Sequence, residues 1–211
     1  MRKLTDKFSI YHLVVIAFMS ACGIAIKSII VPLVHIVTSS LFIPGGAIAG
    51  GIYMLFLVLA RGICKKFGTG FLTGLTQAVM VMIVGVSGSH GIISLVTYAM
   101  PGLAVDIVFL FAKKDNYGIL TFMVAGMAAN LTGSLLVNSV FFNLPLVPLM
   151  LSISLGALSG GFGGVIAWQI YKNLKNHSYC DVTVPHSMPC RVCSGGKICP
   201  LCRPSERTGR R

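Results

Sequence analysis

Six long apolar runs, separated by short polar segments, make up most of the chain. They span residues 8–26, 44–60, 69–86, 92–112, 118–140 and 146–171. An α-helix needs about 20 mostly apolar residues to cross the hydrocarbon core of a bilayer, whereas the strands of a membrane barrel alternate apolar and polar residues. The runs are continuous, so the pattern predicts an all-α integral membrane protein, a six-transmembrane-helix bundle. Residues 28–42, which include Pro32 and His35, are expected to form an outer loop or a partial helix.

Composition agrees with a chain that is solvated mainly by lipid. Hydrophobic residues make up 55% of the 211 and charged residues only 10%. A soluble domain carries about 25% charged residues, because its surface must be wetted.

The basic residues indicate how the bundle faces. Sixteen of the 17 lysines and arginines lie in residues 1–7, 61–66, 113–115 and the segment after residue 171. With the N-terminus inside, all four segments are cytoplasmic, as the excess of Lys and Arg in cytoplasmic loops requires. Lys27 is the exception. We therefore predict a multi-pass protein of the cell membrane with both termini cytoplasmic. We assign the net charge of +12 to contacts with the lipid bilayer and not to nucleic acid.

Composition also divides the chain into a membrane domain, residues 1–175, and a short cysteine-rich cytoplasmic tail, residues 176–211. The tail holds two Cys-x-x-Cys pairs with five residues between them. Four thiolates can bind zinc tetrahedrally, and the reducing cytosol disfavours disulfides. The gap is shorter than in common zinc ribbons, so an iron–sulfur site and no metal at all stay open as alternatives to zinc. No cofactor is expected in the membrane domain. The predicted ligands are Cys190, Cys193, Cys199 and Cys202.

Small residues form a stripe on the first predicted helix. Ala17, Ala21 and Ala25 are each four residues apart and so share one helix face. Such a stripe allows another helix to approach closely, either within the bundle or from a partner. The glycine-rich sixth run predicts tight packing or a bend in the last helix.

Polar residues inside the spans are candidates for function, because their burial in lipid is costly. Asp106 is the one acid within a predicted span, and it is explained equally well by transport or by pairing with Lys113 or the start of the third helix. The other polar candidates would contribute amides, a hydroxyl and aromatic faces to a small outward-facing pocket, or else hydrogen bonds between helices. They are Gln77, His90, Tyr98, Asn130, Ser134 and Asn138.

The spans contain no phosphate-binding G-x-x-x-x-G-K-[ST] loop and no pair of acids. The sequence therefore predicts neither an enzyme nor a protein that couples ions or hydrolyses nucleotide by itself.

Size, six-helix topology, the alanine stripe and residues 91–106 together resemble the substrate-binding S components of energy-coupling factor (ECF) transporters. The resemblance covers residues 8–175, and within the family the chain is most similar to the thiamine or hydroxymethylpyrimidine type. It implies capture of a vitamin or related micronutrient, a small-molecule substrate, from outside. It also implies a membrane T component docked on the alanine stripe and two ATPase subunits as partners. The cysteine tail departs from the family pattern.

Two other readings stay open. One is a stand-alone secondary transporter or channel, and the other is a membrane protein that handles metal or redox chemistry with its cysteine tail.

Overall fold

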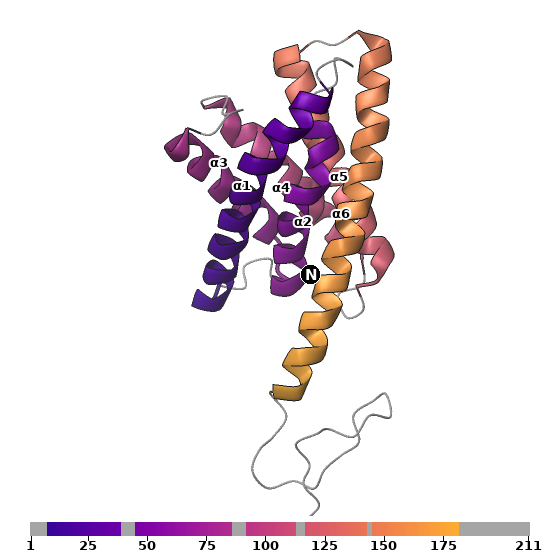
Figure 1. The fold of residues 1–211 in the computed structure, drawn as a ribbon. Coiled ribbons are helices and arrows are strands. Elements are labelled where there is room, and N and C mark those ends of the chain that lie inside the picture. The colour runs from indigo at the N-terminus through magenta and orange to yellow at the C-terminus, as the bar shows by residue number, and fades with distance from the viewer. Residues whose placement is uncertain (1–7, 39–44, 86–91, 113–116, 143–144, 182–211) are drawn as a thin grey trace, which may run out of the picture. The chain divides into compact units, whose positions relative to one another are not determined.

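In the structure, a computed structural model, the polar segments of the sequence separate helices. The structure describes residues 8–38, 45–85, 92–112, 117–142 and 145–181. A π-helical turn, η2 (Asn138–Phe142), continues the fifth helix. Within these ranges no strand occurs, and the all-α prediction is confirmed. In chain order the helices are α1 (Ile10–Thr38), α2 (Gly45–Cys64), α3 (Thr69–Val84), α4 (Ile93–Phe111), α5 (Ile119–Val137) and α6 (Leu146–Asp181) (Figure 1).

Within the described ranges, four helices are long and apolar enough to cross a membrane. Their apolar portions are Ile10–Ile36, Ile93–Phe111, Ile119–Val140 and Leu146–Lys175. The other two apolar helices are shorter in the part that the structure describes, Ile48–Cys64 and Thr69–Val84. A multi-pass membrane protein is thereby supported, while the count of six spans stays a prediction.

The first helix is longer than the sequence pattern predicts. Residues 28–38 were expected to be an outer loop or a partial helix, but α1 continues through them to Thr38 with Pro32 inside. The partial-helix alternative therefore holds as far as Thr38, as a continuation of the first helix, whereas an outer loop over these residues is wrong because Pro32 does not end the helix. Lys27 finds aromatic partners on other helices, and the residues after it are mostly apolar. The last helix is also longer, since α6 runs past residue 171 to Asp181.

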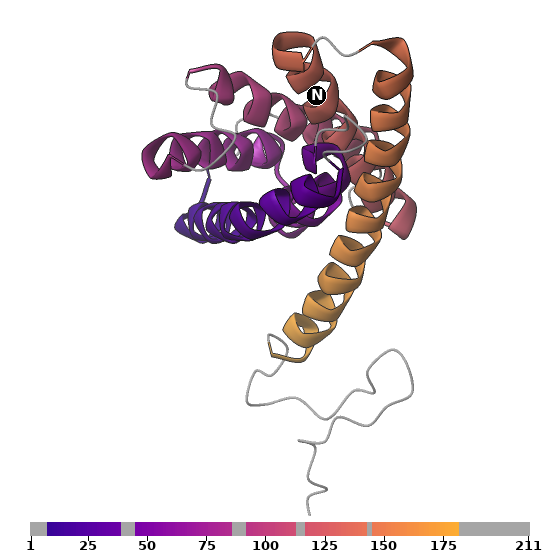
Figure 2. The same ribbon diagram turned by 45° about the horizontal axis from the view of Figure 1, so that its top comes forward.

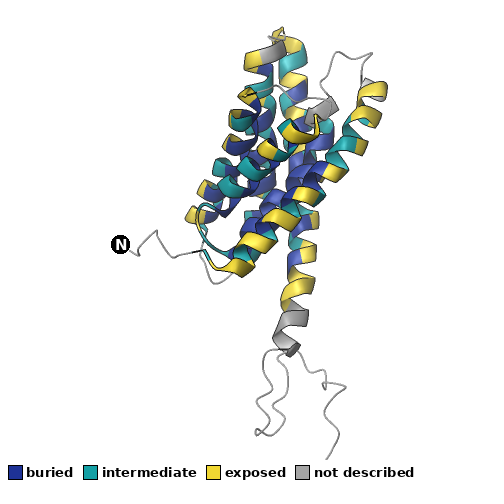
Figure 3. Cartoon of the chain, turned by 90° about the vertical axis from the view of Figure 1, so that its left-hand side faces the viewer, coloured by how far each residue is buried: buried dark blue, intermediate teal, exposed yellow. Residues whose placement is uncertain are grey.

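Helices α3 and α4 pack extensively against each other, and so do α1 and α2. Helices α1 and α3 also contact each other (Figures 1 and 2). Between them, Ser20 Oγ of α1 donates a hydrogen bond to Thr73 O of α3, 3.2 Å away. Buried residues lie on the helix faces that meet, and exposed residues lie on the outer faces (Figure 3). Large apolar side chains such as Ile10, Phe18 and Phe111 are exposed, as a surface in contact with lipid requires.

Glycines bring α6 into backbone contact with its neighbours. A Cβ atom on Gly163 would lie 1.9 Å from Gly51 O of α2, and one on Gly126 of α5 would lie 2.2 Å from Gly160 O. Ser159 reinforces the contact with α2, because its hydroxyl donates to Ile48 O and accepts the N–H of Gly51. The prediction of tight packing for the glycine-rich last helix is confirmed.

The chain forms two compact units, Met1–Asn173 and Leu174–Arg211. The cysteine pairs of the predicted zinc site lie in the second unit, outside the described residues.

Candidate functional site

A small cavity lies between four helices of the first unit. Its volume is about 50 Å³, and it is partly open. Helix α1 contributes Lys27, and the residues from α2, α4 and α5 are Tyr53, Met54, Thr97, Tyr98, Gly133 and Val137. A water molecule needs roughly 10–15 Å³ of such volume, so the cavity has room for about three to five waters or for one small polar group.

Lys27 is the charged group of this cavity. Its ammonium lies 4.3 Å from the centre of the Tyr98 ring and 5.5 Å from that of Tyr53. It also donates a hydrogen bond to the hydroxyl of Tyr98. Both tyrosines are buried, at 9% and 7% exposure for Tyr53 and Tyr98. Aromatic faces attract cations, and more strongly where water is scarce, so the two rings hold the ammonium at the cavity.

Tyr98 is the predicted substrate residue that lines this cavity. The α5 residues that line the same cavity are Gly133 and Val137, each one position before Ser134 and Asn138. One position along a helix turns the side chain by about 100°, so the cavity meets the face next to the predicted one. Ser134 is half-buried, and Asn138 is buried at the first position of η2.

Two more of the predicted substrate residues, Asn130 and Gln77, are not part of the cavity lining. Asn130 Nδ2 donates to Gly156 O of α6 at 2.7 Å, which is the interhelical role weighed in the sequence. Gln77 is buried beside Gly23 of α1, and its Nε2 has no hydrogen-bond partner within the described residues. His90 lies outside the described residues.

Lys27 and Tyr53 were not among the residues that the sequence singled out. The signal for Lys27 was its charge, since it is the one basic residue outside the predicted cytoplasmic segments. The signal for Tyr53 was a hydroxyl within an apolar run. Neither signal shows which side chain would be the partner, because that depends on how the helices pack.

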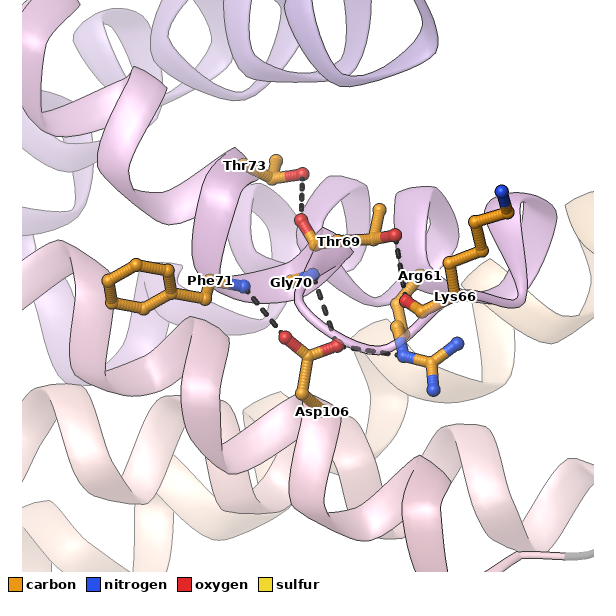
Figure 4. A network of polar contacts seen from close by, with 7 residues as sticks. All are labelled: Arg61, Lys66, Thr69, Gly70, Phe71, Thr73 and Asp106. Carbon is orange, nitrogen blue, oxygen red and sulfur yellow. Dashed lines mark hydrogen bonds and ion pairs between the residues drawn. The ribbon is translucent and has the colours of Figure 1, made fainter. Parts of the chain in front are cut away.

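A second polar cluster joins α2, α3 and α4. Arg61 Nε lies 2.7 Å from Asp106 Oδ1, and the two side chains are 4% and 0% exposed. Asp106 also accepts the backbone N–H groups of Gly70 and Phe71, at 3.2 and 2.9 Å (Figure 4). It thus satisfies donors at the N-terminus of α3, where a negative charge is favourable. Of the roles weighed for Asp106, pairing with the start of the third helix is the one that the structure bears out.

Helix α1 presents its alanine stripe outwards. Ala17, Ala21 and Ala25 are all exposed, while Ile16, Ser20 and Ile24 of the same helix are buried. The stripe is therefore accessible to another helix.

In the described residues, no group of three or more His, Cys, Asp or Glu side chains lies close enough together to hold a metal ion. The free cysteines of this part are Cys22 and Cys64.

Comparison with known protein families shows which family the chain belongs to. Residues 11–132, more than half of the chain, match the family described as "ABC-type cobalt transport system, permease component". The chain belongs to this family. The description is that of a transporter component.

The fold is also that of a known transporter subunit. The structure is similar to one described as "Crystal structure of an S-component of ECF transporter", with a TM-score of 0.68 at 18% sequence identity. The match covers 83% of this chain and 88% of that one. No curated protein matches the sequence. The resemblance to ECF S components is therefore supported at the level of fold, and membership of the permease family supports a role in membrane transport.

Proposed function

We propose that the chain is the substrate-binding subunit of an ECF-type ABC importer that captures a small molecule from outside. The observation that carries the proposal is the cavity at Lys27 and Tyr98, built from four helices of a bundle with an S-component fold. Ligand sites in proteins are commonly concave and apolar with a few converging polar groups, and this cavity has that composition. The charge pattern of the sequence assigns it to the outer half of the bundle.

The exposed alanine stripe on α1 supports the proposed partners. Its small side chains let a helix of a T component approach the α1 backbone closely, and two ATPase subunits would supply the energy. The chain itself shows no nucleotide-binding loop, so it would depend on those subunits.

We propose a vitamin or related micronutrient as the substrate, rather than the cobalt of the family description. A metal ion in the cavity would lie beside the Lys27 ammonium. At an effective dielectric constant of about 20, two unit positive charges about 4 Å apart repel by roughly 4 kcal/mol. Thiamine and its hydroxymethylpyrimidine precursor are the first compounds to test. The same repulsion predicts that the uncharged pyrimidine, and not the cationic thiazolium, would face Lys27.

Uptake measurements in liposomes test this function. The chain would be reconstituted alone, with a T component and ATPases, and with ATPases that cannot hydrolyse ATP. We expect uptake of a bound micronutrient only with the active ATPases. Uptake by the chain alone would instead identify a stand-alone transporter or channel.

Deleting the tail tests the remaining alternative, a protein whose cysteine tail handles metal or redox chemistry. Removing residues 177–211 should leave substrate binding and uptake unchanged, because the cavity residues all lie between Lys27 and Val137. Loss of uptake with intact complex assembly would favour a protein whose cysteine tail carries the function.

A further inference from the structure

Lys27 lies within a long apolar helix. It falls between the first and last residues of the apolar portion Ile10–Ile36 of α1. A charged side chain inside a span is costly and usually marks a functional path or site. Lysines near a span end avoid the cost by extending toward the interface. Lys27 instead turns its ammonium toward Tyr53 and Tyr98 at the cavity.

The partners of this ammonium are dipoles and not a counter-charge. It contacts two aromatic rings and one hydroxyl, and no carboxylate of the described residues forms an ion pair with it. The acid of the described spans, Asp106, is paired with Arg61. It also lies eight residues after Tyr98 on α4, which is about 12 Å along the helix.

The donors that remain at the cavity suit an anion. An ammonium has three N–H donors, and the bond to Tyr98 uses one of them. Since the Tyr98 oxygen accepts that bond, its own O–H is available to donate. The volume of about 50 Å³ accommodates a carboxylate or phosphate group but not a whole vitamin.

We propose that the ligand of this cavity is a small molecule that carries a carboxylate or phosphate, and that this group binds the Lys27 ammonium and the Tyr98 hydroxyl. The inference rests on the proposed function and narrows its substrate class: free thiamine and hydroxymethylpyrimidine carry no anionic group and would be excluded, whereas their phosphate esters would fit. The anion would balance the charge of an ammonium that no carboxylate of the described residues pairs with. Hydrogen bonds between charged partners are stronger than neutral ones, and stronger still where water is scarce.

Matched pairs of micronutrients that differ only in an anionic group test the inference. Suitable pairs are nicotinate and nicotinamide, pantothenate and pantothenol, and the phosphorylated and free forms of pyridoxine and hydroxymethylpyrimidine. Binding would be followed as thermal stabilisation of the full chain in a neutral maltoside detergent, with inorganic phosphate as a further probe. We expect the anionic member of at least one pair to bind about 10- to 100-fold more tightly than its neutral counterpart.

Variants of two cavity residues show whether the preference arises at this site. Lys27→Gln should abolish the preference for the anion, Lys27→Arg should keep most of it, and Tyr98→Phe should weaken it while retaining the ring. Tight binding of only neutral or cationic compounds by the wild-type protein would overturn the inference, even if Lys27→Gln does not fold. So would stabilisation by anions that Lys27→Gln leaves unchanged, or the absence of stabilisation by any anion tested.

Two further experiments distinguish this inference from binding of a lipid phosphate and from the proposed transport function. Phosphatidylglycerol added to the micelles tests a lipid phosphate, and Lys27-dependent stabilisation by this lipid alone would overturn the assignment to a small molecule. Liposome uptake with the T component and ATPases tests the proposed function separately. If a neutral vitamin is imported, the proposed function holds and the inference about an anionic ligand fails. If Lys27-dependent anion binding occurs without ATP-driven uptake, the inference holds and the proposed function fails.

Discussion

The buried pair of Arg61 and Asp106 makes a demanding prediction about stability. Asp106→Asn keeps the size of the side chain and one oxygen that can accept the N–H groups of Gly70 and Phe71, but it removes the negative charge. The guanidinium of Arg61 would then be buried without its counter-charge. Its Nη1 already has no hydrogen-bond partner within the described residues.

The magnitude follows from the burial of the two side chains. With exposures of 4% and 0%, solvent screens the pair little, and removing one partner of such a pair costs about 3–5 kcal/mol. For Arg61→Met the cost should be smaller, because the carboxylate keeps two backbone donors at the start of α3. The double variant Arg61→Met/Asp106→Asn leaves no unpaired charge, so it should be at least as stable as Asp106→Asn alone.

Thermal unfolding in detergent at one heating rate measures these differences. The fluorescence of Trp168, the single tryptophan, reports the transition. A change of 1 kcal/mol shifts the midpoint of a chain of this size by about 2–4 °C, so Asp106→Asn should lower it by about 6–20 °C. Thr132→Val, which removes a hydroxyl bonded within its own helix, is the control and should shift it little.

Two outcomes would refute the reasoning. A midpoint for Asp106→Asn close to that of the control would show that the pair contributes little. Additive losses in the double variant would show that the two side chains act independently, contrary to their 2.7 Å contact.

Three further predictions concern docking, packing and the tail. Leucine in place of the three alanines of the α1 stripe should abolish co-purification with a T component and leave the unfolding midpoint unchanged, because the stripe is exposed; a complex that survives removes the docking proposal. Gly163→Leu should lower the unfolding midpoint strongly, because a Cβ there would lie 1.9 Å from Gly51 O. Gly133→Ala should be tolerated as its control, since the nearest atoms to a Cβ at Gly133 lie 3.4 Å away or more. Equal midpoints for the two variants would contradict this packing. The full chain should carry about one zinc ion by elemental analysis, and Cys190→Ser with Cys193→Ser should lose it; an unchanged metal content would exclude these two ligands.

Part of the candidate site was accessible from the sequence. Tyr98 was expected to line a pocket and does so, and the pairing of Asp106 with the start of the third helix was among the roles considered. The line through Asn130, Ser134 and Asn138 identified the right segment of α5, but the cavity touches the adjacent face. A helical period shows which residues share a face, and the neighbouring helices determine what that face meets.

The sequence by itself determined the helices, their lipid-facing character and the tight packing of the glycine-rich last one. These features follow from local composition, because a long apolar segment must satisfy its backbone hydrogen bonds internally. Only the tertiary structure decided that Lys27 turns to an aromatic residue 71 positions away and that Arg61 pairs with Asp106. In the sequence, both basic residues stood at the end of an apolar run, and only Lys27 was unusual, because it lies outside the cytoplasmic segments. Their partners are set by the packing of distant helices, and no local pattern specifies that packing.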